Sequence, residues 1–243
     1  MKVFLNSISG IDDAIVAMHI SKRHMDRETE LAIRELTRHR LNLDGTRKLP
    51  ENGVENKEAE VFDAFMEKLC KWGKKHTTLL RFIDLSFMVY GLHRGGQDDW
   101  DSHACRFNNR IIRSSTRLAA FGDEMSDYYK DKIMTTDQGL AVLGIQTPDR
   151  IEKDGVAYVK ATNGYIREDM ANVQDAKRGL YMLSIPSDFI FRINLCEFAH
   201  VYKERGQFGG ANPEVKECAE KCADLLNKAH AQFTRDLLLE IKN

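Results

Sequence analysis

Arginine side chains are the groups in this sequence best suited to binding chemistry. They recur beside polar stretches in its middle and C-terminal parts, at Arg106, Arg110, Arg113, Arg117, Arg178 and Arg205. A guanidinium presents fixed, paired N–H donors, which suit an anion. Arg113 and Arg117, four residues apart, could equally form an ordinary solvated face. The residue types alone therefore indicate a protein that binds an anion, and nothing finer.

Two clusters have the composition of a metal site, but a simpler role explains each. Cys218 and Cys222 stand four residues apart on an expected helix, so both thiolates would share one face. No nearby His or Cys completes a set of four ligands, and two packed core thiols are the better interpretation. The carboxylates of Asp98, Asp99 and Asp101 would suit Mg²⁺, yet capping of a helix start explains them as well. We therefore predict no metal site.

Two further segments have a composition that would suit a phosphate site but lack a recognised phosphate-binding motif. Residues 38–40 read Arg-His-Arg. Cations near a helix C-terminus also complement the helix dipole, so we interpret this segment as a solvated helix end. The glycines of residues 206–210 form neither a G-x-G-x-x-G pattern nor a P-loop, and this phosphate-loop interpretation is weak.

Composition excludes several classes of protein. The 243 residues carry 36 Lys and Arg against 37 Asp and Glu, so no general attraction to nucleic acid or to an anionic membrane is expected. Hydrophobic residues make up 42%, enough for a core. No apolar run of about 18 residues predicts a membrane span, and the N-terminus lacks the apolar region of a secretory signal. Five cysteines without a C-x-x-C motif indicate reduced thiols in the cytoplasm.

The elements that must position these residues follow from hydrophobic periodicity. Helical spacing of apolar residues predicts helices over 11–40, 57–72, 123–133, 165–181, 187–204 and 214–241. Strand-like runs cover 2–8, 79–92 and 106–117, and a hairpin is expected over 150–159. Pro213 suits the first position of a helix.

This mixture of long helices and few strands predicts one α+β domain over residues 1–243. We expect the strands 79–92 and 106–117 to share a sheet. The helices 57–72, 187–204 and 214–240 should flank it.

Three stretches resemble the flavin-dependent thymidylate synthases of the ThyX type. Residues 76–87, H-T-T-L-L-R-F-I-D-L-S-F, resemble the family's H-x-[ST]-P-F-E-h-x-x-F-x-F segment. The family signature R-H-R-x-x-S-x-N-E-x-S-x-R-Y falls on residues 101–114. Residues 175–194 resemble E-x-A-R…N, and 194–216 resemble N-x-R-x-x-x-H/N…R…A-Q-W-E-I-R. Residues 37–56 and 118–164 carry no family motif.

The resemblance assigns two groups of binding residues. Arg113, Arg178 and Arg205 fall on arginines that hold the nucleotide in the family, and Asn108 matches the signature asparagine. Positions that line the flavin in the family are occupied here by His76, Thr78, Asn194 and His200. The resemblance also implies a central, mainly antiparallel sheet, and a homotetramer with shared active sites.

The signature departs from the family pattern at several positions. Its R-H-R becomes Asp101-Ser102-His103, and its serine, glutamate and second serine become Arg106, Asn109 and Ile111. In the other motifs, Arg81 replaces a glutamate and Cys196 an arginine. Asp101 would repel a phosphate that an arginine would hold. We hypothesise that Arg106 and Arg110 compensate, and that reversing the charge of Arg106 would weaken nucleotide binding.

The resemblance implies FAD-dependent transfer of a one-carbon unit to C5 of a pyrimidine nucleotide monophosphate. The default reaction converts dUMP to dTMP, with methylenetetrahydrofolate and NADPH as co-substrates. The protein supplies orientation and electrostatics, while the cofactor carries the redox chemistry. The rewritten signature leaves room for an altered nucleotide or product of this reaction. Two alternatives also stay open: a flavin- or nucleotide-binding homologue without methyl transfer, and a protein that shares only the fold.

Overall fold

The structure is a computed structural model of the 243-residue chain. It describes residues 1–22, 24–49, 56–103, 110–114, 150–161, 164–167, 186–207 and 212–238. The chain divides into two compact units: Met1–Tyr90, Gly96–Ile112 and Phe189–Asn243 form the first, and Gly91–Gly95 and Arg113–Asp188 form the second. A single domain over 1–243 stays a prediction.

A four-stranded sheet confirms the α+β class. Its strands follow the order β1 (Lys2–Ser9), β2 (Asp84–His93), β7 (Pro186–Asn194) and β3 (Arg110–Arg113). β1 and β2 are antiparallel, with Lys2 opposite Tyr90 and Ser9 opposite Asp84. Side chains alternate between the two faces, because successive residues of a strand point to opposite sides. Phe87, Phe191 and Ile193 therefore lie on the buried face.

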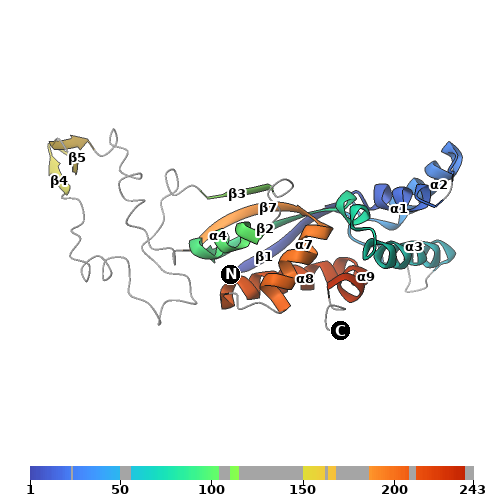
Figure 1. The fold of residues 1–243 in the computed structure, drawn as a ribbon. Coiled ribbons are helices and arrows are strands. Elements are labelled where there is room, and N and C mark those ends of the chain that lie inside the picture. Colours follow the sequence, from blue (N-terminus) through green and yellow to red (C-terminus); the bar gives the residue numbers. More distant parts are fainter. Residues whose placement is uncertain are drawn as a thin grey trace. The chain divides into compact units, whose positions relative to one another are not determined.

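Helices and aromatic side chains cover this buried face. Figure 1 shows α7 (Leu195–Tyr202) and α8 (Pro213–Ala229) along one side of β1, β2 and β7. The Phe87 ring stacks on Phe191 and Phe198, with centroids 5.2 and 5.7 Å apart. Trp100, from α4 (Arg94–His103), packs against Phe191 with 5.1 Å between centroids. Burial of these large rings is the main source of stability for the first unit.

Three N-terminal helices gather where β1 ends (Figure 1). They are α1 (Ile11–Ile20), α2 (Arg27–Arg40) and α3 (Lys57–Gly73). The 57–72 helix is confirmed: the Asn56 side chain caps α3 by accepting from the Ala59 N–H at 3.0 Å. The helix predicted over 11–40 is two helices, because Asp26 caps a new start through the Thr29 N–H at 2.7 Å.

Several predicted elements differ in type or extent. The 79–92 strand begins with the 3₁₀ turn η2 (Thr77–Phe82), and β2 follows it. The 187–204 helix is wrong in its first half: β7 occupies 186–194, and α7 begins only after Asn194. The apolar run Phe189-Ile190-Phe191 hid the two-residue alternation there. The 214–241 helix breaks at His230, after which come α9 (Ala231–Phe233) and the π turn η4 (Thr234–Leu238).

The middle of the chain is described only in part. Of the predicted 106–117 strand, residues 110–113 form β3, which shares the sheet with β2 but is separated from it by β7. The helix predicted over 165–181 starts instead as the strand β6 (Gly164–Arg167). The rest of that helix and the 123–133 helix lie outside the described residues.

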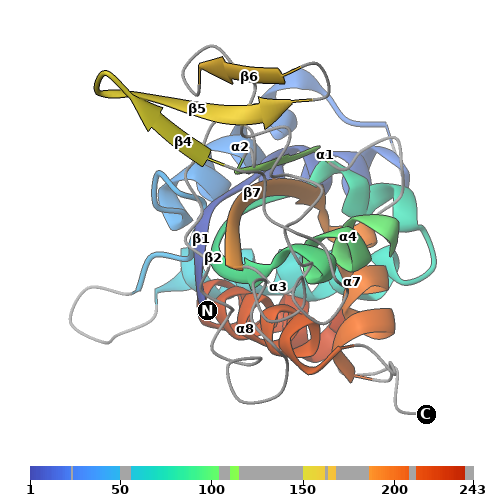
Figure 2. The same cartoon turned by 90° about the vertical axis from the view of Figure 1, so that its left-hand side faces the viewer.

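The second unit contains a separate three-stranded sheet. Figure 2 shows β4 (Arg150–Lys153), β5 (Val156–Ala161) and β6 side by side. β4 and β5 confirm the predicted hairpin: Arg150 pairs with Val159, and Lys153 with Val156. Asp154 and Gly155 both have positive φ, 54° and 72°, which is the backbone of a two-residue hairpin turn.

No helix in the described ranges is both long enough and apolar enough to cross a bilayer.

Candidate functional site

Two segments far apart in the sequence meet at the junction of η2 and α7. The Leu195 N–H at the start of α7 donates to the Ile83 carbonyl, which directly follows η2, at 2.8 Å. Leu79 and Leu80 of η2 are buried beneath this junction. Leu79 and Leu80 thus anchor η2 in the core, Leu80 beside Gly73 of α3, while Thr77 and Thr78 lie at the surface.

All four residues predicted to bind the flavin lie on these two segments. His76 precedes η2 and Thr78 lies within it, and both are exposed. Asn194 is only 2% exposed and caps α7, because its Oδ1 accepts from the Glu197 N–H at 3.0 Å. His200 is exposed near the end of α7. The structure therefore brings the four positions to one pair of contacting elements.

The surface beside His76 is cationic. Residues 68–83 include Lys68, Lys71, Lys74, Lys75 and Arg81, and no Asp or Glu. The His76 ring stacks on Trp72, with centroids 5.6 Å apart and planes inclined by 28°. From the end of α1, the Lys22 Nζ lies 3.6 Å from the Trp72 ring centroid. This concentration of positive charge, in a chain of net charge −1, suits a ligand that carries phosphate groups.

Sequence reasoning missed the contribution of Lys22 and Trp72. The basic run of α3 was visible in the sequence. The approach of α1 to it is a tertiary contact between segments 50 residues apart, which no local pattern shows. The cations also complement the C-terminal dipoles of α1 and α3.

Arg205 is held by an intramolecular carboxylate. It lies on the π turn η3 (Lys203–Gln207), where its Nη2 is 2.8 Å from the Asp99 Oδ1 of α4. Its side chain is 16% exposed, and its buried Nε has no hydrogen-bond partner among the described residues. A phosphate at Arg205 would meet the charge of Asp99 as well. The unpaired N–H suits a neutral acceptor such as a pyrimidine carbonyl better.

The other predicted nucleotide-binding residues are only partly described. Arg113 is half-buried at the end of β3. Arg106, Asn108 and Arg178 lie outside the described residues. Arg110, which we expected to supply a compensating cation, pairs through its Nη2 with the Asp84 Oδ2 at 2.7 Å. Asp84 also lies 3.3 Å from the Arg192 Nε, so this carboxylate already serves two arginines.

The structure describes both clusters whose composition resembles a metal site. Within the described ranges, no three His, Cys, Asp or Glu side chains gather closely enough to hold a metal ion. Cys218 and Cys222 are fully buried on α8, and burial raises the pKa of Cys222 well above its usual value. Burial likewise raises the pKa of the Cys70 thiol to about 12. Asp98, Asp99 and Asp101 lie within α4 rather than at its start, so the capping interpretation is wrong.

Comparison with known proteins identifies the fold. No family model matches the sequence, and no curated protein matches it either. Among solved structures, thymidylate synthase X (ThyX) from Helicobacter pylori with FAD and dUMP aligns with 98% of this chain and 100% of its own, at a TM-score of 0.54 and 13% identity. This chain has the ThyX fold. A second structure of H. pylori flavin-dependent ThyX, complexed with FAD and dUMP, aligns over the same shares at a TM-score of 0.52 and 12% identity. The central mainly antiparallel sheet flanked by helices, which the resemblance implied, is confirmed by this ThyX fold.

Proposed function

We propose that this chain is a flavoenzyme that transfers a one-carbon unit to C5 of a pyrimidine nucleotide monophosphate. The default reaction is the conversion of dUMP to dTMP with FAD, methylenetetrahydrofolate and NADPH. One observation carries the proposal: in a chain with the ThyX fold, the four positions that match flavin-binding residues lie on two contacting elements, η2 and α7. Fold alone would not imply this function.

The residues at the junction fit FAD. The pyrophosphate of FAD is an anion, and the surface beside His76 presents Lys22, Lys75 and Arg81 without a carboxylate in residues 68–83. His76, Thr78 and His200 would hold the cofactor from exposed positions, and Asn194 would do so from the start of α7. When bound, FAD supplies hydride chemistry to the pyrimidine.

The arginines would hold the nucleotide beside the cofactor. We assign Arg178 to the phosphate and Arg205 to the base, with Arg113, Asn108 and Arg106 completing the substrate site. The Asp99 carboxylate supports this division, because it disfavours a phosphate at Arg205 while the Arg205 Nε–H stays available for a carbonyl. Holding the base and phosphate in one orientation gives the proximity that a transfer reaction needs. We propose a homotetramer in which several subunits contribute to each site.

The same ion pair favours a second candidate function. A homologue that binds flavin or nucleotide without methyl transfer would tolerate an arginine sequestered by Asp99, and Asp101-Ser102-His103 in place of the family's R-H-R. Such a protein would serve as a binding or regulatory subunit.

The absorption spectrum of the purified protein tests the proposal. Flavin absorption bands, with FAD as the released cofactor, are the expected result, and they should be lost in His76→Ala but not in His39→Ala, which alters an exposed histidine at the end of α2. Complementation of a thymidine auxotroph then separates the enzyme from the binding homologue. A colourless protein that takes up no FAD would overturn the enzyme, and one that in addition binds no pyrimidine nucleotide monophosphate would overturn both candidates.

A further inference from the structure

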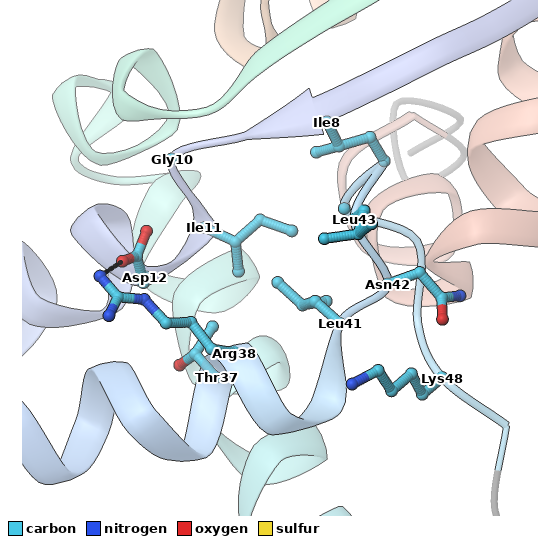
Figure 3. Close-up of a pocket in the computed structure, with 11 residues that line it drawn as sticks. Ile8, Gly10, Ile11, Asp12, Thr37, Arg38, Leu41, Asn42, Leu43 and Lys48 are labelled. Carbon is cyan, nitrogen blue, oxygen red and sulfur yellow. Dashed lines mark ion pairs between the residues drawn. The ribbon is translucent and has the colours of Figure 1, made fainter.

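A cavity of about 540 Å³ opens where β1 runs into α1 and α2 runs into the following loop. Its volume lies within the range of small-molecule sites. Figure 3 shows the side chains of Ile11, Leu41 and Leu43 converging on its centre, with Ile8 beside them. Of the residues predicted to bind flavin or nucleotide, the six that the structure describes (His76, Thr78, Arg113, Asn194, His200 and Arg205) do not line it. The cavity is therefore distinct from the η2–α7 junction.

The loop that walls the cavity is held in place by several contacts. The Ile8 N–H donates to the Asp44 carbonyl at 2.7 Å, and His230 contacts the Gly45 carbonyl through Nε2 at 2.7 Å. The Asp44 side chain accepts from both the N–H and the hydroxyl of Thr46. Gly45 has a φ of +80°, and an added Cβ would lie 1.9 Å from the Ile8 oxygen. The walls are thus fixed by the chain itself, which lowers the ordering cost of binding a ligand.

The rim of the cavity carries a surplus of positive charge. Arg38 and Lys48 both line it, and the Arg38 side chain is 72% exposed. Among the described lining residues, Asp12 is the one carboxylate, and its Oδ2 lies 3.0 Å from the Nη1 of Arg34, which also pairs with Asp13 and Glu30. The Arg38 Nη2 is 4.0 Å from the same oxygen, beyond hydrogen-bond distance. Arg38 and Lys48 can therefore turn their donors toward a ligand.

The site is completed by apolar side chains that are exposed to water when no ligand is bound. Leu43 is as exposed as in an extended chain, at 110%, although it borders the cavity. Such exposure gains nothing for folding, whereas an apolar ligand laid against Leu43 and the half-buried Leu41 would remove their surface from water. Ile11 also lines the cavity but is only 1% exposed, so it adds little surface of its own. Cations at the rim and apolar walls inside form a pattern that matches an amphipathic anion.

We infer that this cavity binds a small amphipathic anion, whose phosphate or carboxylate contacts Arg38 and Lys48 and whose apolar body lies against Ile11, Leu41 and Leu43. Phosphate and carboxylate share the chemistry that two adjacent cations recognise. The Arg-His-Arg segment at 38–40, interpreted from sequence as a solvated helix end, thereby gains a ligand-binding role through its first residue.

Titration calorimetry of the full chain tests the inference with three matched probes. They are 2-naphthyl phosphate, 2-naphthoate and the neutral 2-naphthol. We expect at least one of the anions to bind at least about tenfold more tightly than 2-naphthol, since a charge-assisted contact separates them. Preference for the phosphate or the carboxylate identifies which anion the site takes.

Variants locate the binding. Arg38→Gln and Lys48→Gln should each weaken the preferred anion about tenfold to a hundredfold, and Lys2→Gln, at the far end of β1, should not. Leu43→Ser should weaken the naphthyl anions without lowering the melting temperature, because Leu43 is already exposed. Any of three results would overturn the inference. They are equal affinity for all three probes, unchanged affinity in both charge variants, and no binding at millimolar concentrations of the probes.

Discussion

The guanidinium of Arg205 and the carboxylate of Asp99 form an ion pair of 2.8 Å between η3 and α4. Arg205 was predicted from sequence as a nucleotide ligand, while Asp99 was taken as a helix cap. The pair connects segments 106 residues apart and sets the chemistry of the proposed nucleotide site. Its carboxylate lowers the local positive potential at the position where the family resemblance places an anionic substrate.

Asp99→Asn should tighten dUMP binding about threefold to tenfold, because a nearby negative charge is removed while the shape is kept. Calorimetric titration of the flavin-loaded protein measures this change. Asp98→Asn, one residue away on the exposed side of α4, is the control and should leave the affinity unchanged. Equal affinities in all three proteins would show that Asp99 does not act on the nucleotide.

Arg178→Ala should weaken dUMP by about 1.5–3 kcal/mol, or tenfold to a hundredfold, by removing a charge-assisted contact to the phosphate. Its affinity for FAD should hardly change. His76→Ala should show the reverse pattern, with weakened FAD and largely retained dUMP binding. Calorimetry with both ligands on both variants measures the contrast. If both variants lose the same ligand, the division into two sites is wrong.

His230 should make the protein less stable as the pH falls from 7 to 5. Burial lowers the pKa of His230 from 6.5 to about 4, and the side chain is 1% exposed. Below pH 6.5 the unfolded chain takes up a proton that the folded chain refuses, so the free energy of unfolding should drop by about 2 kcal/mol over this interval. Urea unfolding at both pH values measures it.

The control is His230→Gln, in which the amide can still donate to the Gly45 carbonyl. Its free energy of unfolding should vary less with pH than that of the parent, by about the same 2 kcal/mol. Parallel pH profiles of parent and variant would exclude His230 as the titrating group.

Gly45→Ala should destabilise the protein by about 2 kcal/mol or more. The residue has a φ of +80°, and a methyl group would collide with the Ile8 carbonyl oxygen. Gly155→Ala is the matched comparison: φ is +72°, but nothing lies within 4 Å of the added Cβ, so only the backbone cost of about 1 kcal/mol remains. Thermal melts monitored by circular dichroism rank the two variants. Similar losses would mean that the loop yields to the collision.

Local signals in the sequence predicted several elements well. A regular apolar stripe over 57–72 marked α3, Asp154-Gly155 marked the β4–β5 turn, and Pro213 stands at the first turn of α8. Each of these rests on a short-range pattern that the sequence displays directly. Element type was wrong in β7, where the buried residues alternate but the exposed Ile190 stands between Phe189 and Phe191 and interrupts the polar side of the pattern.

For the candidate flavin site, the sequence predicted which residues belong to it but not the contacts that those residues and their neighbours make. The resemblance pointed to His76, Thr78, Asn194 and His200, and the structure places them on contacting elements. The contacts of Asp99 with Arg205, and of Lys22 with Trp72, depend on tertiary packing. Neither pair has a sequence spacing that a periodic pattern would reveal.

α1 joins the two regions that we propose as ligand sites. Ile11, its first residue, lines the cavity, while Lys22, just beyond its last residue, lies over Trp72 beside His76. The ten residues of α1 span about 15 Å. If an occupant of the cavity displaces α1 at Ile11, Lys22 moves relative to the proposed flavin site. Thermodynamic linkage then requires each ligand to change the affinity for the other by the same factor. The two proposed sites would then be coupled, and an anion bound at one end of α1 would change the affinity for FAD at the other.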